Sequence, residues 1–291
     1  MRRNFIAWIA ALPVIISCTS LQAQKVVDGF SSPESVLKNG DRLFVSNING
    51  NPAEKDGNGF ISELDADGKV LRQKFQKEIL NAPKGLAVIN NVLYVADIDR
   101  IVGFDTKSGE QVFGLNIAGA NFLNDLCKAG DNILAVSESM SNKIYLVNTD
   151  NKTYSVAGLV AGANGLTYNA KTNQLFACGM GEQMNGKGKL YVKDLKSKDT
   201  VFTELQNSPT GIFDGLEMMD DSHLLVSDWI SFTSDKARLV VYDVKAHTNT
   251  VYSFEAGPAD ITYDKTTAKI YIPQLPKNRL VITSIDKLKK E

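Results

Sequence analysis

The sequence predicts an all-β fold, a six-bladed β-propeller with four-stranded blades, and three observations support this prediction. A five-residue apolar phrase recurs six times along the 291 residues. Each copy is followed by a second run of strand length, which usually ends in Asp or Asn, residues that start turns through their side chains. The copies recur about every 40 to 50 residues, which is the size of a propeller blade.

The repeated phrase is expected to form the second strand of each blade. Its copies are rich in β-branched and aromatic residues, as strands are. A short strand before each copy, typified by PKGLAVI at 83–89, supplies the first strand. In chain order the copies are LFVSN (43–47), LYVAD (93–97), LAVSE (134–138), LFACG (175–179), LLVSD (224–228) and IYIPQ (270–274).

The runs that follow the phrase complete the blades. The third strands are predicted at ISELD (61–65), IVGFD (101–105), IYLVN (144–148), LYVKD (190–194), LVVYD (239–243) and LVITS (280–284). Outer strands are predicted at KVLRQKF (69–75), EQVFGL (110–115), KTYSV (152–156), TVFTEL (200–205) and NTVYSF (249–254).

The last copy has no outer strand before the charged end DKLKKE at 286–291. The segment QKVVDGF at 24–30 is expected to supply that strand and to close the ring, which removes an open sheet edge. Two sandwich domains or a solenoid are the alternatives. Neither accounts for one repeat that runs through the chain without a linker.

Residues 1–23 have the pattern of an export signal. Arg2 and Arg3 precede the apolar run FIAWIAALPVII, which is too short to span a bilayer comfortably. Two processing sites remain open: IISC at 15–18 resembles a bacterial lipobox that would leave a lipidated Cys18, whereas LQA before Gln24 suits ordinary cleavage. We expect a periplasmic or extracellular monomer whose residues 24–291 form a single propeller domain, with membrane contact only through such a lipid.

Composition and residue types exclude several functions. The net charge is −1 and no basic cluster is interleaved with aromatic residues, which argues against nucleic-acid binding. Cys127 and Cys178 are expected to be buried free thiols, with a disulfide between them as the alternative. His223 and His247 fall on turns, which argues against a Ser/His/Asp triad. The Gly-rich run at 179–189 is expected to be a hairpin insertion and not a phosphate loop.

One polar position recurs about ten residues before each phrase. We call it the slot, and it holds Glu34, Lys84, Asn124, Asn164, Asp214 and Ala259. The innermost strands of a propeller line its channel, so the slots of successive blades should converge. Two carboxylates and two carboxamides then offer hard oxygen ligands, which suit Ca²⁺ or a similar cation. The alternative is that these residues cap the inner strands and bind channel waters.

The slot pattern resembles the gluconolactonase, regucalcin and luciferin-regenerating-enzyme family of six-bladed propellers. The matching motifs are short and are spread over residues 24–291: Glu34 in SPESV, Asn124-Asp125, Asn164-Gly165 and Asp214-Gly215. The resemblance implies that Glu34, Asn164 and Asp214 hold a divalent metal, with Asn124 beside it to contact substrate or metal-bound water. Ca²⁺ is the expected ion, and Mg²⁺, Mn²⁺ or Zn²⁺ are alternatives.

The chain departs from the family in ways that bear on the substrate. Ser35-Val36 follows the first glutamate, where the family commonly has Gly-Pro, and Phe122 stands where sugar-lactone hydrolases have Arg. Phe122 therefore favours a less hydroxylated or aromatic substrate, unless it is plain packing. Lys84 either binds a substrate anion or a developing oxyanion, or extends to the channel mouth. Glu138, and likewise Asp228 with Trp229, are candidates for substrate selection on loops.

Three functions are therefore compared. The first is an exported, metal-dependent hydrolase of lactones or related esters, in which the metal polarises the carbonyl and Asp214 is the general base. The second is a non-catalytic propeller that binds a protein, glycan or small ligand and uses the ion to stiffen its channel, since residues 83–105 resemble NHL-type repeats. The third, phosphotriester hydrolysis, needs a roomier apolar pocket.

Overall fold

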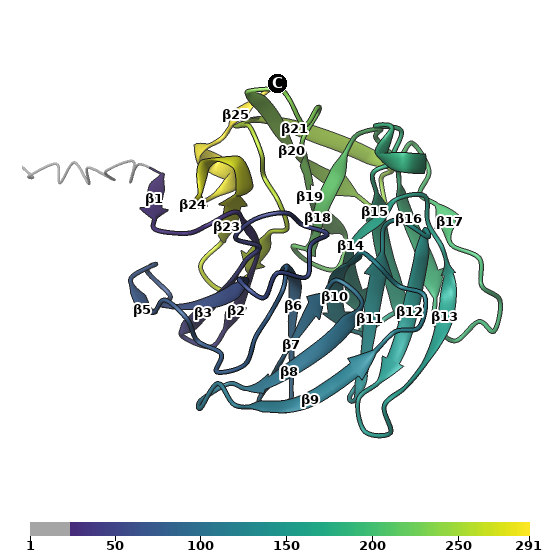
Figure 1. The fold of residues 1–291 in the computed structure, drawn as a ribbon. Coiled ribbons are helices and arrows are strands. Elements are labelled where there is room, and N and C mark those ends of the chain that lie inside the picture. Colours follow the sequence, from purple (N-terminus) through teal and green to yellow (C-terminus); the bar gives the residue numbers. More distant parts are fainter. Residues whose placement is uncertain (1–23) are drawn as a thin grey trace, which may run out of the picture.

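Six antiparallel sheets arranged in a ring form the protein, as a computed structural model of residues 24–291 shows (Figure 1). The prediction of a six-bladed β-propeller is confirmed. The predicted signal peptide and Cys18 lie outside the described residues. None of the helices in residues 24–291 has the length and apolar character that a membrane span requires.

Each blade consists of four strands in sequence order from the channel outward, except where the ring closes. The inner strands are β2 (Pro33–Asn39), β6 (Pro83–Ile89), β10 (Leu123–Lys128), β14 (Ala163–Asn169), β18 (Phe213–Met218) and β22 (Thr262–Asp264). The second strands, formed by the repeated phrase, are β3 (Arg42–Asn47), β7 (Val92–Asp97), β11 (Ile133–Glu138), β15 (Gln174–Gly179), β19 (His223–Asp228) and β23 (Lys269–Gln274).

The outer halves of the blades also follow the prediction. The third strands are β4 (Phe60–Asp65), β8 (Arg100–Asp105), β12 (Lys143–Asn148), β16 (Leu190–Asp194), β20 (Lys236–Asp243) and β24 (Arg279–Thr283). The outer strands are β5 (Val70–Arg72), β9 (Gln111–Asn116), β13 (Thr153–Leu159), β17 (Thr203–Glu204), β21 (Thr248–Glu255) and β1 (Lys25–Asp28). Short 3-10 turns lie at Glu182–Met184, Leu275–Lys277 and Ile285–Lys287.

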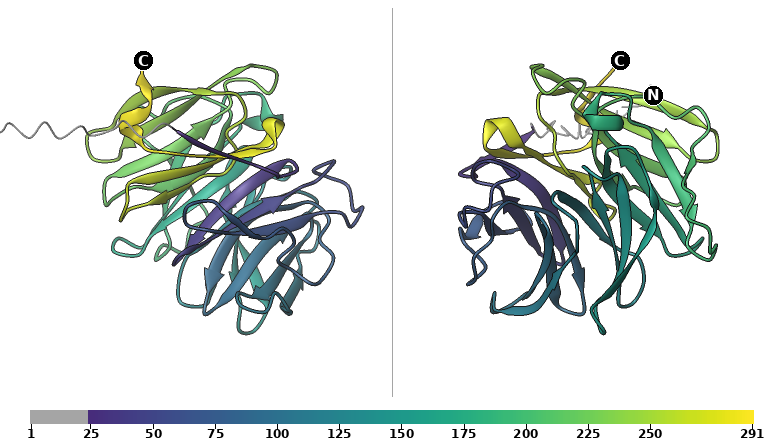
Figure 2. Two further views of the ribbon diagram at one scale, coloured as in Figure 1. Left: turned by 90° about the vertical axis from the view of Figure 1, so that its left-hand side faces the viewer. Right: turned by 45° about the vertical axis from the view of Figure 1, so that its right-hand side comes forward.

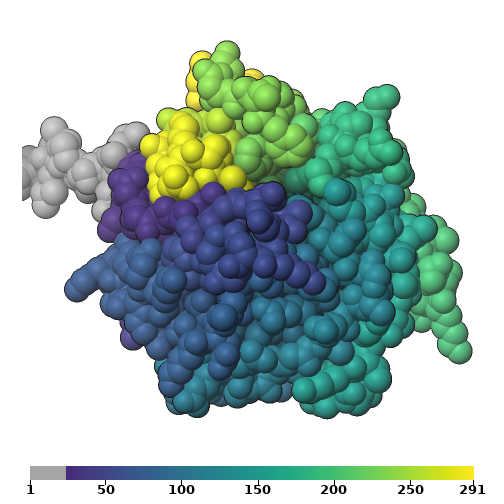
Figure 3. All heavy atoms as spheres, viewed as in Figure 1, coloured from purple at the N-terminus to yellow at the C-terminus, as the bar shows by residue number. Residues whose placement is uncertain are grey.

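The sixth blade is completed from the other end of the chain. Strand β1 pairs with β24, so that Val27 lies opposite Leu280, and the predicted closure is confirmed. The views in Figure 2 show the first and last blades next to each other, and Figure 3 shows the purple N-terminal segment beside the yellow last blade on the surface. The charged end of the chain was expected to be a tail, but Lys289–Lys290 form β25, a fifth strand on the edge of β21.

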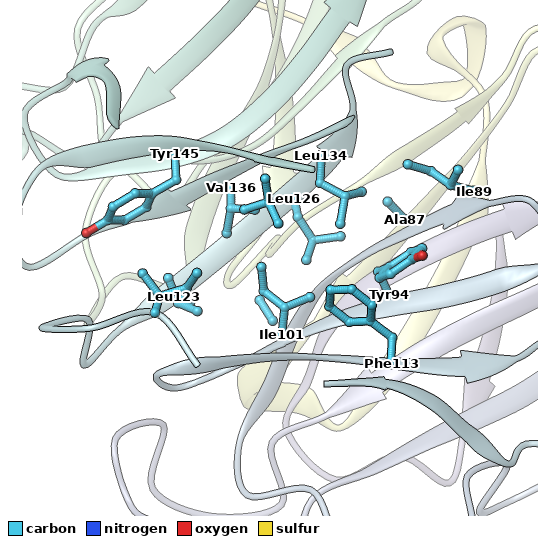
Figure 4. Packing of buried hydrophobic residues seen from close by; sticks show 13 residues of the cluster. Ala87, Ile89, Tyr94, Ile101, Phe113, Leu123, Leu126, Leu134, Val136 and Tyr145 are labelled. Carbon is cyan, nitrogen blue, oxygen red and sulfur yellow. The ribbon is translucent and has the colours of Figure 1, made fainter. Parts of the chain in front are cut away.

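Neighbouring blades are held together by apolar side chains between their faces. Figure 4 shows the cluster between the second and third blades, where the rings of Tyr94 and Phe113 meet edge to face. Leu123 and Leu126 of β10 belong to the same cluster. Successive side chains of a strand point to opposite faces of the sheet. Each blade therefore packs one set of apolar side chains against the preceding blade and another set against the following blade.

A bulge at the start of the inner strand sets the position of the slot. In the first blade the pairing of β2 with β3 shifts between Pro33 and Val36, and the same shift recurs in the next four blades. A serine of the repeated phrase holds the bulged backbone in three blades: Ser46 Oγ accepts the Ser35 N–H at 2.9 Å, and Ser137 and Ser227 act likewise. At each bulge, two residues of the inner strand lie opposite one residue of the second strand. The slot residue is the first of these two, so it has the same position in each of these five blades.

The inner strands approach each other closely behind the slot, and glycine permits this. A Cβ on Gly165 would lie 2.5 Å from the carbonyl oxygen of Asp214 and 2.6 Å from the amide nitrogen of Leu216. Gly215 is similarly close to the backbone of the last blade. In the Asn-Gly and Asp-Gly pairs, the first residue therefore places a polar side chain in the channel. The glycine lets the next inner strand approach so closely that no larger residue would fit.

Candidate functional site

Four of the six slot residues line one cavity of about 240 Å³ at the end of the channel: Glu34, Lys84, Asn124 and Asp214. They lie on four different inner strands, and none is more than 5% exposed. Asn164 is also buried and joins the group through a hydrogen bond to Asp214. Ala259 occupies the slot of the last blade, so that side of the site has no polar side chain.

Asp214 is held at both carboxylate oxygens. The Asn164 amide donates to Oδ1 at 3.0 Å, and the Trp229 indole N–H donates to Oδ2 at 2.7 Å. Burial raises the pKa of Asp214 to about 6, although these two hydrogen bonds oppose the rise. The carboxylate is therefore fixed in orientation and more basic than an ordinary aspartate.

Three other oxygen atoms around Asp214 are buried and have no hydrogen-bond partner among the described residues. They are Glu34 Oε2, Asn124 Oδ1 and Asn164 Oδ1. Asn124 is oriented by donating to Ser139 Oγ at 2.9 Å, and Ser139 in turn donates to the Ala163 carbonyl at 2.7 Å. Buried acceptors without donors are rare in folded proteins, so these atoms are placed either to accept a hydrogen bond from water or to coordinate a cation.

The Glu34 carboxyl is the second buried acid of the cavity. Burial raises its pKa well above the ordinary value, the charge of Asp214 raises it further, and Lys84 opposes the rise. Two carboxylates in one enclosed site repel each other unless a cation lies between them. The repulsion between Glu34 and Asp214 and the unpartnered oxygens are thus both features that a bound cation would relieve.

Lys84 is buried in the wall of the cavity. Its ammonium donates to the carbonyl oxygens of Pro52 at 2.9 Å and Ala82 at 3.2 Å. It also lies 4.4 Å above the centre of the Phe122 ring. Burial lowers the pKa of Lys84 to about 8, and the charge of Glu34 limits the fall.

The cavity walls above these polar groups are apolar. Phe122 lines the cavity, and Trp229 stacks at an angle on Phe232, with 5.4 Å between ring centres. The remaining wall residues come from loops between strands and were not singled out in the sequence: Ile48, Pro52, Met180, Met184 and Leu275. Met180 and Met184 belong to the Gly-rich insertion between β15 and β16, as a hairpin insertion would place them.

Glu138 is not among the residues that line the cavity, contrary to its selection as a substrate contact. Its carboxylate is fully buried and accepts the backbone N–H groups of Phe122 at 2.9 Å and Ser141 at 2.5 Å. Asp228 acts in the same way on Ile212 and Ile230 at 3.0 and 2.9 Å, and also pairs with Arg238. Both acids hold the loops that shape the cavity.

The repeated phrase contains a signal for this structural role. Its fifth residue is polar in five of the six copies, and Asn47 and Asp97 also accept backbone N–H groups of the preceding loop, at 2.9 and 3.0 Å. These side chains bond the loop backbone of their own blade and so serve the blade itself. By contrast, three slot oxygens have no partner among the described residues.

A second group of acids lies farther along the channel. Asp125, Glu217 and Asp260 line a separate cavity of about 270 Å³, and burial raises the pKa of Asp125 and of Glu217 to about 7. Asp125 accepts the backbone N–H of Leu166 at 2.7 Å and so links two blades. These acids line a cavity separate from the slot, although burial and the charges of Glu34 and Asp214 raise the pKa of Asp260.

The cysteines and histidines do not line the slot cavity, although the Cys178 thiol donates to the backbone carbonyl oxygen of Asp214 at 3.4 Å. Cys127 and Cys178 are free thiols, as expected, and burial raises the pKa of both. His223 is the first residue of β19, and its Nδ1 lies 2.8 Å from Asp220 Oδ2. His247 is in the turn between β20 and β21. Neither histidine lines the slot cavity.

The donor set fits a hard divalent cation. Residues 24–291 contain no group of three or more His, Cys, Asp and Glu side chains arranged for a metal. A cation in the slot would therefore depend on the carboxamide oxygens of Asn164 and Asn124 as well as on Glu34 and Asp214. Such mixed carboxylate and carbonyl ligands are typical of Ca²⁺.

Comparison with known proteins gives structural likeness alone. No family model matches the chain, and no curated protein matches it. Among solved structures, hydrazine synthase of Kuenenia stuttgartiensis aligns with a TM-score of 0.62 at 15% identity, over 92% of this chain and 80% of that chain.

Two further solved structures are similar over nearly the whole chain. The β-propeller domain of Cps50 (Swd1) from Myceliophteria thermophila has a TM-score of 0.60 at 12% identity, over 90% of this chain and 99% of that one. Virginiamycin B lyase from Staphylococcus aureus has a TM-score of 0.61 at 13% identity, over 90% and 100%. At these identities the likeness supports the fold and says nothing of the site: the chain has a β-propeller fold.

Proposed function

We propose that the slot cavity binds a divalent cation, with Ca²⁺ preferred, through Glu34, Asn164 and Asp214. The observation that supports this most directly is the set of three buried oxygens without donors beside Asp214. The two carboxylates balance the charge of a divalent ion, and their mutual repulsion is relieved when it binds. Asn124 lies at the edge of this group and contacts the ligand or its water.

We propose further that the protein hydrolyses a small lactone or related ester in this cavity. A bound cation supplies Lewis-acid polarisation of a carbonyl. Asp214 takes a proton from the attacking water and returns it to the leaving alkoxide, as the new bond from water oxygen to carbonyl carbon replaces the bond to the alkoxide. Trp229 and Asn164 keep the carboxylate in one orientation during both transfers.

The walls favour an apolar substrate. Phe122, Trp229 and Phe232 supply three aromatic rings, and the two methionines of the insertion add adaptable surface. Such walls have few groups that would replace the water lost by the hydroxyls of a sugar lactone. Aryl esters and alkyl lactones are therefore the substrates we expect.

A non-catalytic binding protein is the second candidate, and the contacts of Asp214 favour it. Both carboxylate oxygens already accept hydrogen bonds, which suits a rigid ligand for an ion as well as it suits a base. In that case Ca²⁺ stiffens the channel and the cavity holds a small apolar ligand without turnover.

The proposed function is tested with the mature protein and two variants. Calorimetric titration with Ca²⁺ should give one site, and the chelated protein should melt at a lower temperature. Hydrolysis of phenyl acetate, δ-lactones and an aryl phosphotriester should appear only with the cation present. Asp214→Asn should abolish turnover, whereas Asp220→Asn, a matched change on an outer turn, should have no effect.

The outcomes separate the candidates. Failure of the protein to bind Ca²⁺, Mg²⁺, Mn²⁺ or Zn²⁺ in the slot, or full activity of Asp214→Asn, contradicts the metal-dependent hydrolase. Ca²⁺ binding that raises the melting temperature, without turnover of any substrate class, selects the binding protein.

We also propose export to the periplasm or cell exterior, on the pattern of residues 1–23. Ca²⁺ sites of extracellular modules work at about 10⁻⁴ to 10⁻³ M, so a site with two carboxylates would be filled there. Cell fractionation with a Cys18→Ala variant tests both points: a lipidated protein leaves the membrane fraction when Cys18 is removed, and an ordinary secreted one does not change.

A further inference from the structure

Lys84 is buried, and no carboxylate of the described residues forms an ion pair with its ammonium. Its ammonium is on the cavity wall and 1% of the residue is exposed. Both of its hydrogen bonds go to carbonyl oxygens, of Pro52 and Ala82, instead of to a carboxylate. Only the more distant charges of Glu34 and Asp97 favour its charged form.

These contacts leave part of the ammonium unused. An ammonium has three N–H donors, and two of them are used by the carbonyl groups. Its other neighbour is the face of Phe122, at 4.4 Å from the ring centre. An acceptor that entered the cavity would therefore meet a fixed, largely desolvated positive charge.

The charge balance of the loaded cavity assigns the sign of the ligand. Glu34 and Asp214 together neutralise one divalent cation, so Glu34 no longer compensates Lys84 when the cation is bound. Asp97, the other acid that favours the charged ammonium, already pairs with Arg100. One positive charge therefore remains inside apolar walls, where an unpaired charge is costly. A ligand with a single negative charge restores neutrality, whereas a phosphate dianion would leave an excess negative charge.

We infer that the cavity selects a ligand with one carboxylate on a small apolar body, and that Lys84 is the residue that recognises the carboxylate. The inference rests on the proposed function, since it assumes a cation at Glu34 and Asp214. In the hydrolase it makes the substrate an ester or lactone whose reactive carbonyl faces the cation and whose carboxylate faces Lys84. The apolar body lies between them, against Phe122 and Trp229.

The test is a binding measurement that needs no turnover. Calorimetry with the Ca²⁺-loaded protein compares 4-acetamidobenzoate with 4-acetamidobenzamide, which have the same shape and differ in charge. The carboxylate should bind about 10- to 100-fold more tightly than the neutral amide, the usual effect of a charge-assisted hydrogen bond. Lys84→Met should remove that preference, and Lys84→Arg should keep part of it.

Lys152 offers a matched control. It also lies over a phenylalanine ring, 5.1 Å from the centre of Phe113, but it is exposed on the outside of the ring of blades. Lys152→Met makes the same change in net charge and should leave both affinities unchanged. Melting temperatures of all variants separate loss of recognition from loss of fold.

Each outcome bears on one of the two proposals. A Lys84-dependent preference for the carboxylate without hydrolysis of 4-acetoxybenzoate keeps this inference and contradicts the hydrolase. Hydrolysis of neutral aryl acetates with no effect of Lys84→Met on either affinity keeps the hydrolase and overturns this inference. Tighter Lys84-dependent binding of phenyl phosphate or inorganic phosphate than of the carboxylate also overturns it.

Discussion

Trp229 donates its indole N–H to the carboxylate of Asp214, with 2.7 Å between Nε1 and Oδ2. The two residues lie on different parts of the fifth blade: Asp214 is the second residue of the inner strand, and Trp229 directly follows the second strand. The bond joins the wall of the cavity to its polar base.

Trp229→Phe should therefore weaken Ca²⁺ binding while the fold persists. Partners that orient a ligand typically contribute about 10- to 100-fold to metal affinity, and we expect a loss in that range by calorimetry. Phe232→Leu is the control, because Phe232 contacts the Trp229 ring without bonding Asp214. Equal losses in both variants would mean that packing, and not the hydrogen bond, determines the affinity.

Glu138→Ala should lower the free energy of unfolding by about 1–3 kcal/mol, because it leaves buried backbone N–H groups without an acceptor. Glu138→Gln should cost less, since it keeps one oxygen. Urea denaturation measures both, with the exposed Glu54→Ala as a control. A variant of normal stability that no longer binds ligand would restore Glu138 as a direct contact.

The pH dependence of stability should change when Glu217 is neutralised. The pKa of this acid is raised to about 7 by burial, above its ordinary value of 4.5, so the folded state favours the protonated form. Its contribution is thus fully present below about pH 4.5 and is lost as the pH rises through 7. Glu217→Gln should match the parent at pH 4 and exceed it by about 1–3 kcal/mol at pH 8.

Denaturant midpoints of the parent and Glu217→Gln across this range give the difference directly, because the other titrating groups are common to both proteins. Asp243→Asn is a useful comparison, since hydrogen bonds from the Ala246 and Lys245 backbone lower the pKa of Asp243. That variant should lose stability relative to the parent above pH 4. A constant difference for Glu217→Gln at every pH contradicts the buried acid.

Gly165→Ala should destabilise the protein by about 1–3 kcal/mol, because the new methyl group would contact backbone atoms of the next blade that cannot move independently. Gly114→Ala is the matched change: its Cβ would meet only the flexible end of Gln111, at 3.2 Å. Thermal melting of the two variants should separate them clearly, and equal melting temperatures would contradict the close approach of the inner strands.

The ring closure predicts unequal losses of stability for substitutions at two neighbouring valines. Val27 packs on the cluster formed with Tyr271 and Leu280, whereas Val26 is 44% exposed on the other face of β1. Val27→Asp should cost about 2 kcal/mol or more, and Val26→Asp should stay within about 0.5 kcal/mol. Similar losses in chemical denaturation would show that β1 does not pack as described.

The sequence was informative about the fold because the same constraints recur in each blade. A strand phrase and a turn residue repeat with every blade, so even weak local signals add up, and the closing strand followed from the one copy that lacked an outer strand. The strand at Lys289–Lys290 was not predicted, because two lysines carry no strand pattern. This strand forms because the edge of β21 is free to pair with it.

The site was predictable only where it depends on register. The bulge places Glu34 and Asp214 at the same point of their blades, so alignment of the repeats brought them together. The walls could not be found in this way, because Met180 and Leu275 belong to loops whose lengths differ between blades. Glu138 was misjudged because its position beside a loop does not reveal that its carboxylate turns back to the loop backbone.

The pairing of β1 with β24 also determines when the molecule is complete. These strands come from opposite ends of the described chain, so their pairing closes the largest loop in the fold. We therefore expect this pairing to form last and slowly. Until then β24 presents free N–H and C=O groups to any passing strand, including β1 of another copy. During synthesis β1 emerges first and stays unpaired until the final blade follows, and exchange of β1 between two molecules is the misassembly that this architecture invites.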